Sequence, residues 1–193
     1  MRRTTALIPA AITALALAGC GSAGSASTAG TASGPASATA QAAASPSSSP
    51  DCTSQFIAWR DAGDGKAQLL AVETDLGQFS TAAGDVGSAM GSGSDASSAE
   101  SALQSAAASL QSDDDAAEAN LPPACVPGLR RDISQGLTEY SKAASDAQNA
   151  VSEIGSGSYT VADGDIKATV RAEDAGTAAI IKGAGAMKAF NNS

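Results

Sequence analysis

The chain has 193 residues, and its 20 acidic residues outnumber its 11 basic ones, which gives a net charge of −9 at pH 7. An acidic chain is a poor partner for nucleic acid, because affinity for nucleic acid comes mainly from Lys and Arg side chains that neutralise phosphates. The chain contains no His, which removes the commonest general base and metal ligand, and with them every His-based catalytic triad.

The first residues have the pattern of an export signal. Arg2 and Arg3 give a positive start, and residues 6 to 18 are almost entirely apolar. This apolar stretch is shorter than the roughly 20 residues that a membrane-spanning helix needs. We therefore expect residues 1 to 19 to be a signal peptide that is removed.

Leu17-Ala18-Gly19-Cys20 closes this segment with Leu, two small residues and Cys. The four positions resemble the lipobox of bacterial lipoproteins, and the resemblance covers residues 1 to 20. It implies cleavage after Gly19 and a diacylglycerol, with acyl chains such as palmitate, on the Cys20 sulfur. Two acyl chains give stable anchoring, since each buried methylene contributes about 0.8 kcal/mol. The resemblance thus implies a mature protein held by lipid on the extracytoplasmic face of a cell membrane.

The route of export and the membrane itself stay open. Arg2-Arg3 could feed a twin-arginine route, although Thr4-Thr5-Ala6 fits that pattern poorly. The Ala- and Gly-rich bias resembles lipoproteins of high-GC Gram-positive bacteria, which implies the outer leaflet of the cytoplasmic membrane. In an organism with two membranes, Gly21 after the cysteine would instead permit sorting to the outer membrane.

Residues 21 to 50 consist almost only of Ala, Gly, Ser, Thr and Pro. Such a segment cannot bury enough apolar surface to offset its ordering entropy, so we expect residues 20 to 50 to be a lipidated, flexible tether. Its coil dimension would place the following domain on the order of 30 Å from the bilayer. No second change in composition divides residues 51 to 193, which we take as one domain.

Apolar residues recur at steps of three and four in four stretches of this domain, the spacing of one helix face. The expected helices cover residues 66 to 87, 97 to 121, 127 to 155 and 160 to 187. In chain order their apolar stripes are Leu69, Val72, Leu76, Phe79, Ala83 and Val86; Leu103, Ala106 or Ala107, Leu110, Ala117 and Leu121; Leu129, Ile133, Leu137, Tyr140, Ala144, Ala147, Val151 and Ile154; and Ile166, Val170, Thr177, Ile180, Ala184 and Met187.

Capping residues and breakers suggest where these helices begin and end. Ser97 with Glu100 reads as a capping box, and Pro122-Pro123 ends the second helix. Pro127 fits the first turn of the third helix, where a missing N–H costs nothing. Thr160 with Asp163 is a candidate cap for the fourth.

Phe56, Ile57 and Trp59 predict an extra helical turn before the first long helix, separated from it by Gly63-Asp64-Gly65. No stretch alternates branched or aromatic residues with polar ones, which disfavours strands. Four amphipathic helices with short connections predict an all-α, up-down-up-down four-helix bundle.

Two cysteines remain after lipidation of Cys20. In this topology Cys52, just before the first long helix, and Cys125, just after the second, lie at the same end of the bundle. In an oxidising, extracytoplasmic setting this pair predicts a disulfide. Closing so long a loop would stabilise the fold by about 4 to 5 kcal/mol in the chain-entropy model.

Acidic side chains are the remaining candidates for a metal-binding or catalytic role. Asp113-Asp114-Asp115, with Glu118 nearby, could attract calcium, but neighbouring positions on a helix point about 100° apart, so we read the cluster as a solvated face. Asp163-Gly164-Asp165 lacks the later ligands of a calcium loop and reads as a helix start. Glycines at 84, 87, 91 and 93 read as loop rather than as a nucleotide cradle. We therefore expect no metal, no cofactor and no thiolate chemistry.

Trp59 and Arg60, close to the cysteine pair, form a candidate contact patch, because Trp and Arg are favoured at interfaces. The alternative is a buried Trp that caps the end of the bundle. Together these features predict a membrane-anchored, non-catalytic module that binds a protein or another envelope component. A structural spacer without a ligand is the main alternative, and an enzyme would need paired carboxylates in a cleft.

Overall fold

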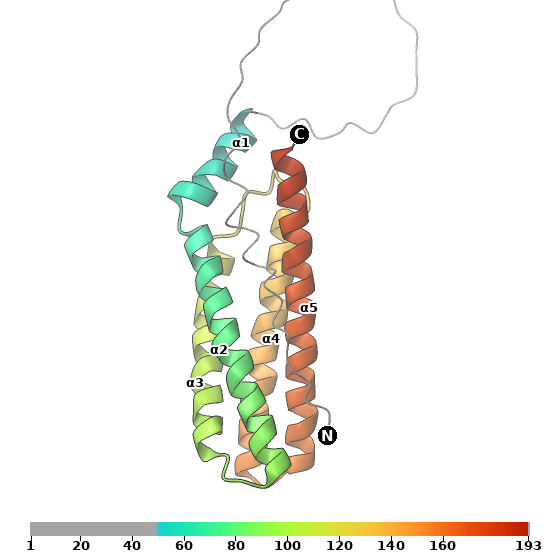
Figure 1. Ribbon diagram of the computed structural model, residues 1–193. Helices are drawn as coiled ribbons and strands as arrows, with labels where there is room; N and C mark the ends of the chain where they lie inside the picture. Colours follow the sequence, from blue (N-terminus) through green and yellow to red (C-terminus); the bar gives the residue numbers. More distant parts are fainter. Residues whose placement is uncertain (1–49, 193) are drawn as a thin grey trace, which may run out of the picture.

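The computed structural model describes residues 50 to 192, so the expected signal peptide and tether, and Cys20 with them, lie outside the described residues (Figure 1). Within that range the chain forms helices, turns and no strand, which confirms the all-α class. The elements are α1 (Pro50–Ile57), the π-helical turn η2 (Ala58–Ala62), α2 (Gly65–Ser92), α3 (Ser97–Ala119), α4 (Leu129–Gly155) and α5 (Tyr159–Asn191).

The four long helices run alternately up and down, and α5 ends beside α1 (Figure 1). Contacts are extensive between α4 and α5, between α2 and α3, and between α3 and α4, but sparse between α2 and α5. The fold is therefore the predicted up-down-up-down bundle with one loosely closed side. In Figure 1 the ribbons of α2 and α5 separate towards the end at which α1 lies.

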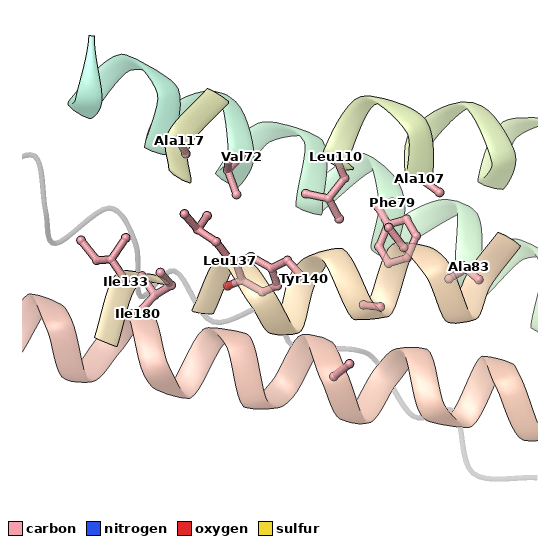
Figure 2. Close-up of a cluster of buried hydrophobic side chains, with 14 of the residues drawn as sticks. Val72, Phe79, Ala83, Ala107, Leu110, Ala117, Ile133, Leu137, Tyr140 and Ile180 are labelled. Atoms are coloured by element: carbon pink, nitrogen blue, oxygen red, sulfur yellow. The ribbon is translucent and has the colours of Figure 1, made fainter. Parts of the chain in front are cut away.

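The core runs along the bundle and is built from the predicted stripes. Figure 2 shows Val72 and Phe79 of α2 facing Leu137 and Tyr140 of α4, with Leu110 of α3 beside them. Phe79, Leu110 and Tyr140 have no solvent exposure. The stripe on α4 is buried at nearly every expected position, because its large aliphatic side chains alternate with alanines that let neighbouring helices approach.

Helices α4 and α5 approach each other closely at two glycines. A Cβ on Gly136 would lie 2.6 Å from Ile180 Cδ1, and a Cβ on Gly176 would lie 2.5 Å from Tyr140 Cε1 and 3.0 Å from the Gly136 carbonyl oxygen. Only glycine fits at such distances. Two facing glycines thus explain why this pair of helices makes the most extensive contact in the bundle.

A disulfide joins Cys52 of α1 to Cys125 in the α3–α4 connection, with a Cα–Cα distance of 5.8 Å across 73 positions of sequence. The predicted pairing is confirmed. At the same end Phe56 packs edge-on against Phe190 of α5, with ring centroids 5.5 Å apart. The bundle end that carries α1 is therefore held to both the α3–α4 connection and the last turns of α5.

The break after η2 is as predicted, but several helix ends differ from expectation. The Ser97 capping box does not form, because Asp95 Oδ1 accepts the Ser97 N–H at 2.9 Å. This hydrogen bond is the main reason why the pKa of Asp95 lies below its usual value. Pro127 precedes α4, which starts after Gly128 at a φ of 79°, a conformation that favours glycine.

The last helix begins at Tyr159, so Thr160 is not its cap, and Asp163 lies inside α5 paired with Lys167. Its predicted stripe is also wrong at Val170, which is 46 % exposed, while the neighbouring Thr169 is fully buried. The buried face of α5 is set by small residues that allow close approach to α4, and these carry no hydrophobic signal in the sequence.

Candidate functional site

The loosely closed side of the bundle contains an apolar cleft between α2, α4 and α5, which we call the α2–α5 cleft. The cleft has a volume of about 30 Å³, room for about one or two waters. The apolar walls come from three helices: Leu69, Leu70 and Val72 of α2, Ile133 and Leu137 of α4, and Ile180, Ala184 and Met187 of α5.

Trp59 of η2 lines the outer end of the cleft. Its indole N–H donates a hydrogen bond of 2.7 Å to the Asn120 carbonyl oxygen, just beyond α3, and its ring lies 5.9 Å from that of Phe56. A Cβ on Gly65 would lie 2.1 Å from Trp59 Nε1, so glycine at the start of α2 makes room for the indole. Trp59 is half-buried, and it both caps the bundle end and borders the cleft.

The local backbone explains how Trp59 and its neighbour reach this position. Gly63 N–H donates to the Ala58 carbonyl oxygen at 2.7 Å, closing a π-helical turn with one more residue than an α-helical turn. Such turns are rare and are frequent at functional sites. The wider turn carries both Trp59 and Arg60 to the outer end of the cleft.

Two basic side chains, Arg60 and Lys66, line the same outer end. Arg60 forms an ion pair with Asp61 at 2.6 Å and lies 5.8 Å above the Phe56 ring, within cation–π distance. The hydrogen bond to Arg60 is the main cause that lowers the pKa of Asp61, and the Lys66 charge adds to it. Lys66 takes part in none of the ion pairs found in residues 50 to 192.

The lining of the cleft leaves apolar surface exposed at Leu70, which is 42 % exposed. An exposed aliphatic side chain beside an apolar cleft favours a binding surface over a spacer.

Tyr140 forms the inner end of the cleft, and buried polar groups lie around it. Its hydroxyl shares a hydrogen bond of 3.2 Å with Thr177 Oγ1. The pKa of Tyr140 is raised to about 12. Burial is the main cause, and the negative charges of Asp114, Glu173 and Glu73 contribute as well. Carboxyl groups from three helices therefore lie near this one hydroxyl.

Two of these carboxyl groups are unusual. Burial raises the pKa of Asp114 to about 7, against the hydrogen bond that Ser141 Oγ donates to Asp114 Oδ2 at 3.2 Å. Burial, with the Asp174 charge, raises the pKa of Glu173 to about 7. Asp114 Oδ1 and Glu173 Oε1 are buried without a hydrogen-bond partner among the described residues.

The expectation of a solvated face for Asp113-Asp114-Asp115 is thus wrong for its middle residue. Asp114 is 2 % exposed and points into the bundle, whereas Asp115 and Glu118 are exposed. Asp113 faces Asp75 of α2, whose pKa is raised mainly by burial and then by that neighbour. The three Asp side chains diverge as expected, and in the described part of the chain no group of three or more acidic or Cys side chains could hold a metal ion.

Another buried acid, Asp132, has the opposite environment. Burial alone would raise its pKa, but hydrogen bonds from Arg131 at 2.8 Å and Lys182 at 3.2 Å outweigh burial and lower the pKa of Asp132. This group links α4 to α5 and belongs to the structure of their interface. It takes no part in the cleft.

Of the sequence candidates, Trp59 and Arg60 line the cleft together, and Cys52 and Cys125 join α1 to the α3–α4 connection at the same end of the bundle. Asp163 and Asp165 lie within α5, away from it. The expected glycine loop is wrong for Gly84, Gly87 and Gly91, which lie inside α2.

Sequence reasoning missed Lys66 and the cleft walls, because Leu69, Val72 and Ile180 look the same in a sequence whether they fill a core or line a cleft. A weak signal was present in Leu70, which lies next to the apolar stripe of its helix and not within it. No carboxylate lines the cleft among the residues that the structure describes.

Comparison of the chain with protein-family models, with curated proteins and with solved structures found no match. Among the described helices, none is long and apolar enough to cross a bilayer.

Proposed function

We propose that this protein is a lipid-anchored, extracytoplasmic binding module that takes up an apolar ligand in the α2–α5 cleft and carries out no catalysis. The observation that carries the proposal is the cleft itself, whose walls are apolar and whose lining includes the exposed Leu70. Ligand sites are typically concave and apolar with a few polar groups that fix orientation. Here those groups are Arg60 and Lys66.

The lipid anchor rests on the lipobox resemblance at Leu17-Ala18-Gly19-Cys20. Mass spectrometry of the mature N-terminus should find an acylated Cys20 as the first residue. Cys20→Ala should leave the chain unprocessed or release it from the membrane. An unmodified Cys20, or cleavage at another site, would remove the anchor from the proposal while leaving the cleft.

Uptake of a ligand needs a cleft that can widen, since its volume is only about 30 Å³. The sparse contact between α2 and α5 supports such a movement. In contrast, α5 is fixed to α4 by the close approach at Gly136 and Gly176. We therefore propose that α2 moves relative to α5 when a ligand enters.

Filling the cleft tests the proposal. Ala184 lines it, so Ala184→Phe should occupy the space and reduce binding of the neutral apolar dye Nile red about tenfold or more. Ala178→Phe is the matched control, because Ala178 is exposed on α5 and does not line the cleft. Circular dichroism should show both variants folded. No dye binding by the parent protein, or equal binding by both variants, would refute a ligand site in the cleft.

The spacer alternative predicts a uniformly polar exterior and no dye binding. The exposed apolar side chain of Leu70 beside the cleft favours the binding function over the spacer. An enzyme based on paired carboxylates finds no support in the residues that line the cleft.

A further inference from the structure

The α2–α5 cleft has two chemically different parts. Its walls are aliphatic along α2, α4 and α5, and its outer end carries the side chains of Arg60 and Lys66. The distance along α5 from Ile180 to Met187 is about 10 Å at a rise of 1.5 Å per residue. A ligand that matches this arrangement has an elongated apolar part and a negative group at one end.

The positive charge at the outer end is only partly compensated. Asp61 pairs with Arg60 at 2.6 Å, while Lys66 is half-buried and forms none of the ion pairs of the described residues. A Lys side chain beside an apolar surface can lay its methylene stem along that surface and keep its ammonium group at the mouth. An anionic group seated there would gain a charge-assisted hydrogen bond.

The opposite end of the cleft disfavours a negative group. Tyr140 lines that end, whereas the two basic residues of the lining, Arg60 and Lys66, lie at the outer end. An anion placed deep in the cleft would therefore have no positively charged partner in the lining. The charge distribution therefore orients a ligand with its anionic group outward, beside Lys66, and its apolar part inward.

The expected anchor favours a lipid over a peptide. Residues 1 to 49 precede α1 in the chain, so the anchor of the proposed function would keep the domain near a membrane, where single-chain amphiphiles are found. The walls are helices whose backbone groups are already paired, so they offer no edge to which an extended peptide could add.

We infer that the ligand of the α2–α5 cleft is a single-chain anionic amphiphile of the fatty-acid class, bound with its chain against Leu69, Leu137 and Ile180 and its carboxylate at Lys66. This inference rests on the proposed function, since it names the ligand of the same cleft. Arg60 contributes to the outer end with its charge largely held by Asp61.

The test uses the chain from residue 20 onward with Cys20→Ser, so that no detergent is needed. Trp59 is the only Trp of the chain and borders the cleft, so its fluorescence reports occupancy. Dodecanoate, dodecanol and dodecyltrimethylammonium are compared below the concentrations at which they form aggregates. Dodecanoate should bind about tenfold more tightly than dodecanol, and the cationic amphiphile should bind most weakly.

Two charge variants separate local from general electrostatics. Lys66→Gln should weaken binding of dodecanoate about tenfold and leave dodecanol unchanged. Lys167→Gln is the matched control, because it removes the same charge from α5 at a residue that does not line the cleft. Equal effects of the two variants, or tighter binding of the cationic amphiphile, would overturn the assignment of an anionic ligand.

The failure of this inference can be told apart from the failure of the proposed function. If Nile red binds in a way that Ala184→Phe abolishes but dodecanoate and dodecanol bind equally, the cleft is a ligand site and the anionic class is wrong. If neither the dye nor any amphiphile binds, the proposed function is wrong as well.

Discussion

Helix α5 meets two neighbours in two different ways. Against α4 it places Gly176 so close that a single added carbon would collide with Tyr140 and with the backbone of Gly136. Against α2 it makes few contacts, and the space between them is an apolar cleft. The comparison shows that side-chain size sets the spacing of these helices: where both helices carry glycine the interface closes, and where both carry Leu, Ile or Met it stays open at the end that the disulfide holds.

Removal of the disulfide should have the largest effect. Cys52→Ser together with Cys125→Ser should lower the free energy of unfolding by about 2 to 5 kcal/mol, measured by urea denaturation. Because the disulfide holds α1 and not α5, hydrogen exchange should accelerate most in α1, η2 and the start of α2. Uniform acceleration in α4 and α5 as well would show that the two interfaces of α5 are not independent.

The contact between α4 and α5 at Gly136 and Gly176 should be the next most sensitive to substitution. Gly176→Ala should cost about 1 to 3 kcal/mol, because the added Cβ would lie 2.5 Å from Tyr140 Cε1 and the packed ring has little room to shift. Gly164→Ala, also in α5 but with nothing within 4 Å, should stabilise the protein by about 0.5 to 1 kcal/mol. Thermal and urea unfolding of the pair would measure the difference, and equal stabilities would contradict the packing described at Gly176.

Dependence on pH should follow from the carboxyl groups around Tyr140. The pKa of Asp114 rises from 3.8 to about 7 and that of Glu173 from 4.5 to about 7, so the folded state holds these protons more tightly than the unfolded state. Stability is then greatest below the unfolded values, falls as the pH rises from about 4 to about 7, and levels off above the folded values. Between pH 5 and pH 8 we expect a loss of a few kcal/mol, up to about 2.7 kcal/mol for each group.

Substitution by the neutral amide checks the origin of this loss. Asp114→Asn removes the titrating group but keeps its shape, so the variant should lose less stability than the parent chain on going from pH 5 to pH 8. Asp115→Asn is the control, because Asp115 is an exposed neighbour. Urea denaturation at the two pH values measures both, and equal pH dependence in the parent chain and Asp114→Asn would exclude Asp114 as a cause.

Changes at two exposed aliphatic side chains should have the smallest effect on stability. Leu70→Ser and Ile181→Ser each alter a side chain that is more than 40 % exposed, so the free energy of unfolding should change by less than about 0.5 kcal/mol. Binding of Nile red should fall in Leu70→Ser, because Leu70 lines the cleft, and stay unchanged in Ile181→Ser, because Ile181 does not. A large loss of stability would indicate that these side chains pack against the bundle.

Sequence reasoning succeeded where burial follows large side chains and failed where it follows small ones. The stripe of α4 was predictable because Ile133, Leu137 and Tyr140 repeat at helical spacing. The buried face of α5 was not, since Gly176 and Gly183 carry no hydrophobic signal and their role depends on how closely α4 approaches.

The candidate site shows the same limit. Trp59 and Arg60 could be selected by residue type, but the cleft beside them depends on the spacing of α2 and α5, which no local pattern encodes. Burial of Asp114 did have a signal, because it lies four residues after Leu110 and three before Ala117, on the buried stripe of α3. Because Asp114 stands between two other Asp residues, we interpreted all three as exposed and missed its position on the buried stripe.

The π-helical turn at Ala58–Ala62 sets how the residues before it are rotated about the helix axis relative to α2. A turn closed from Gly63 N–H to the Ala58 carbonyl oxygen holds one residue more than an α-helical turn. Deleting a single residue there would let α1 continue as an ordinary α-helix, and everything before the deletion would rotate by about 100° relative to α2. Cys52 would then point away from Cys125, so one residue of length at this turn sets the geometry that both the disulfide and the outer end of the cleft require.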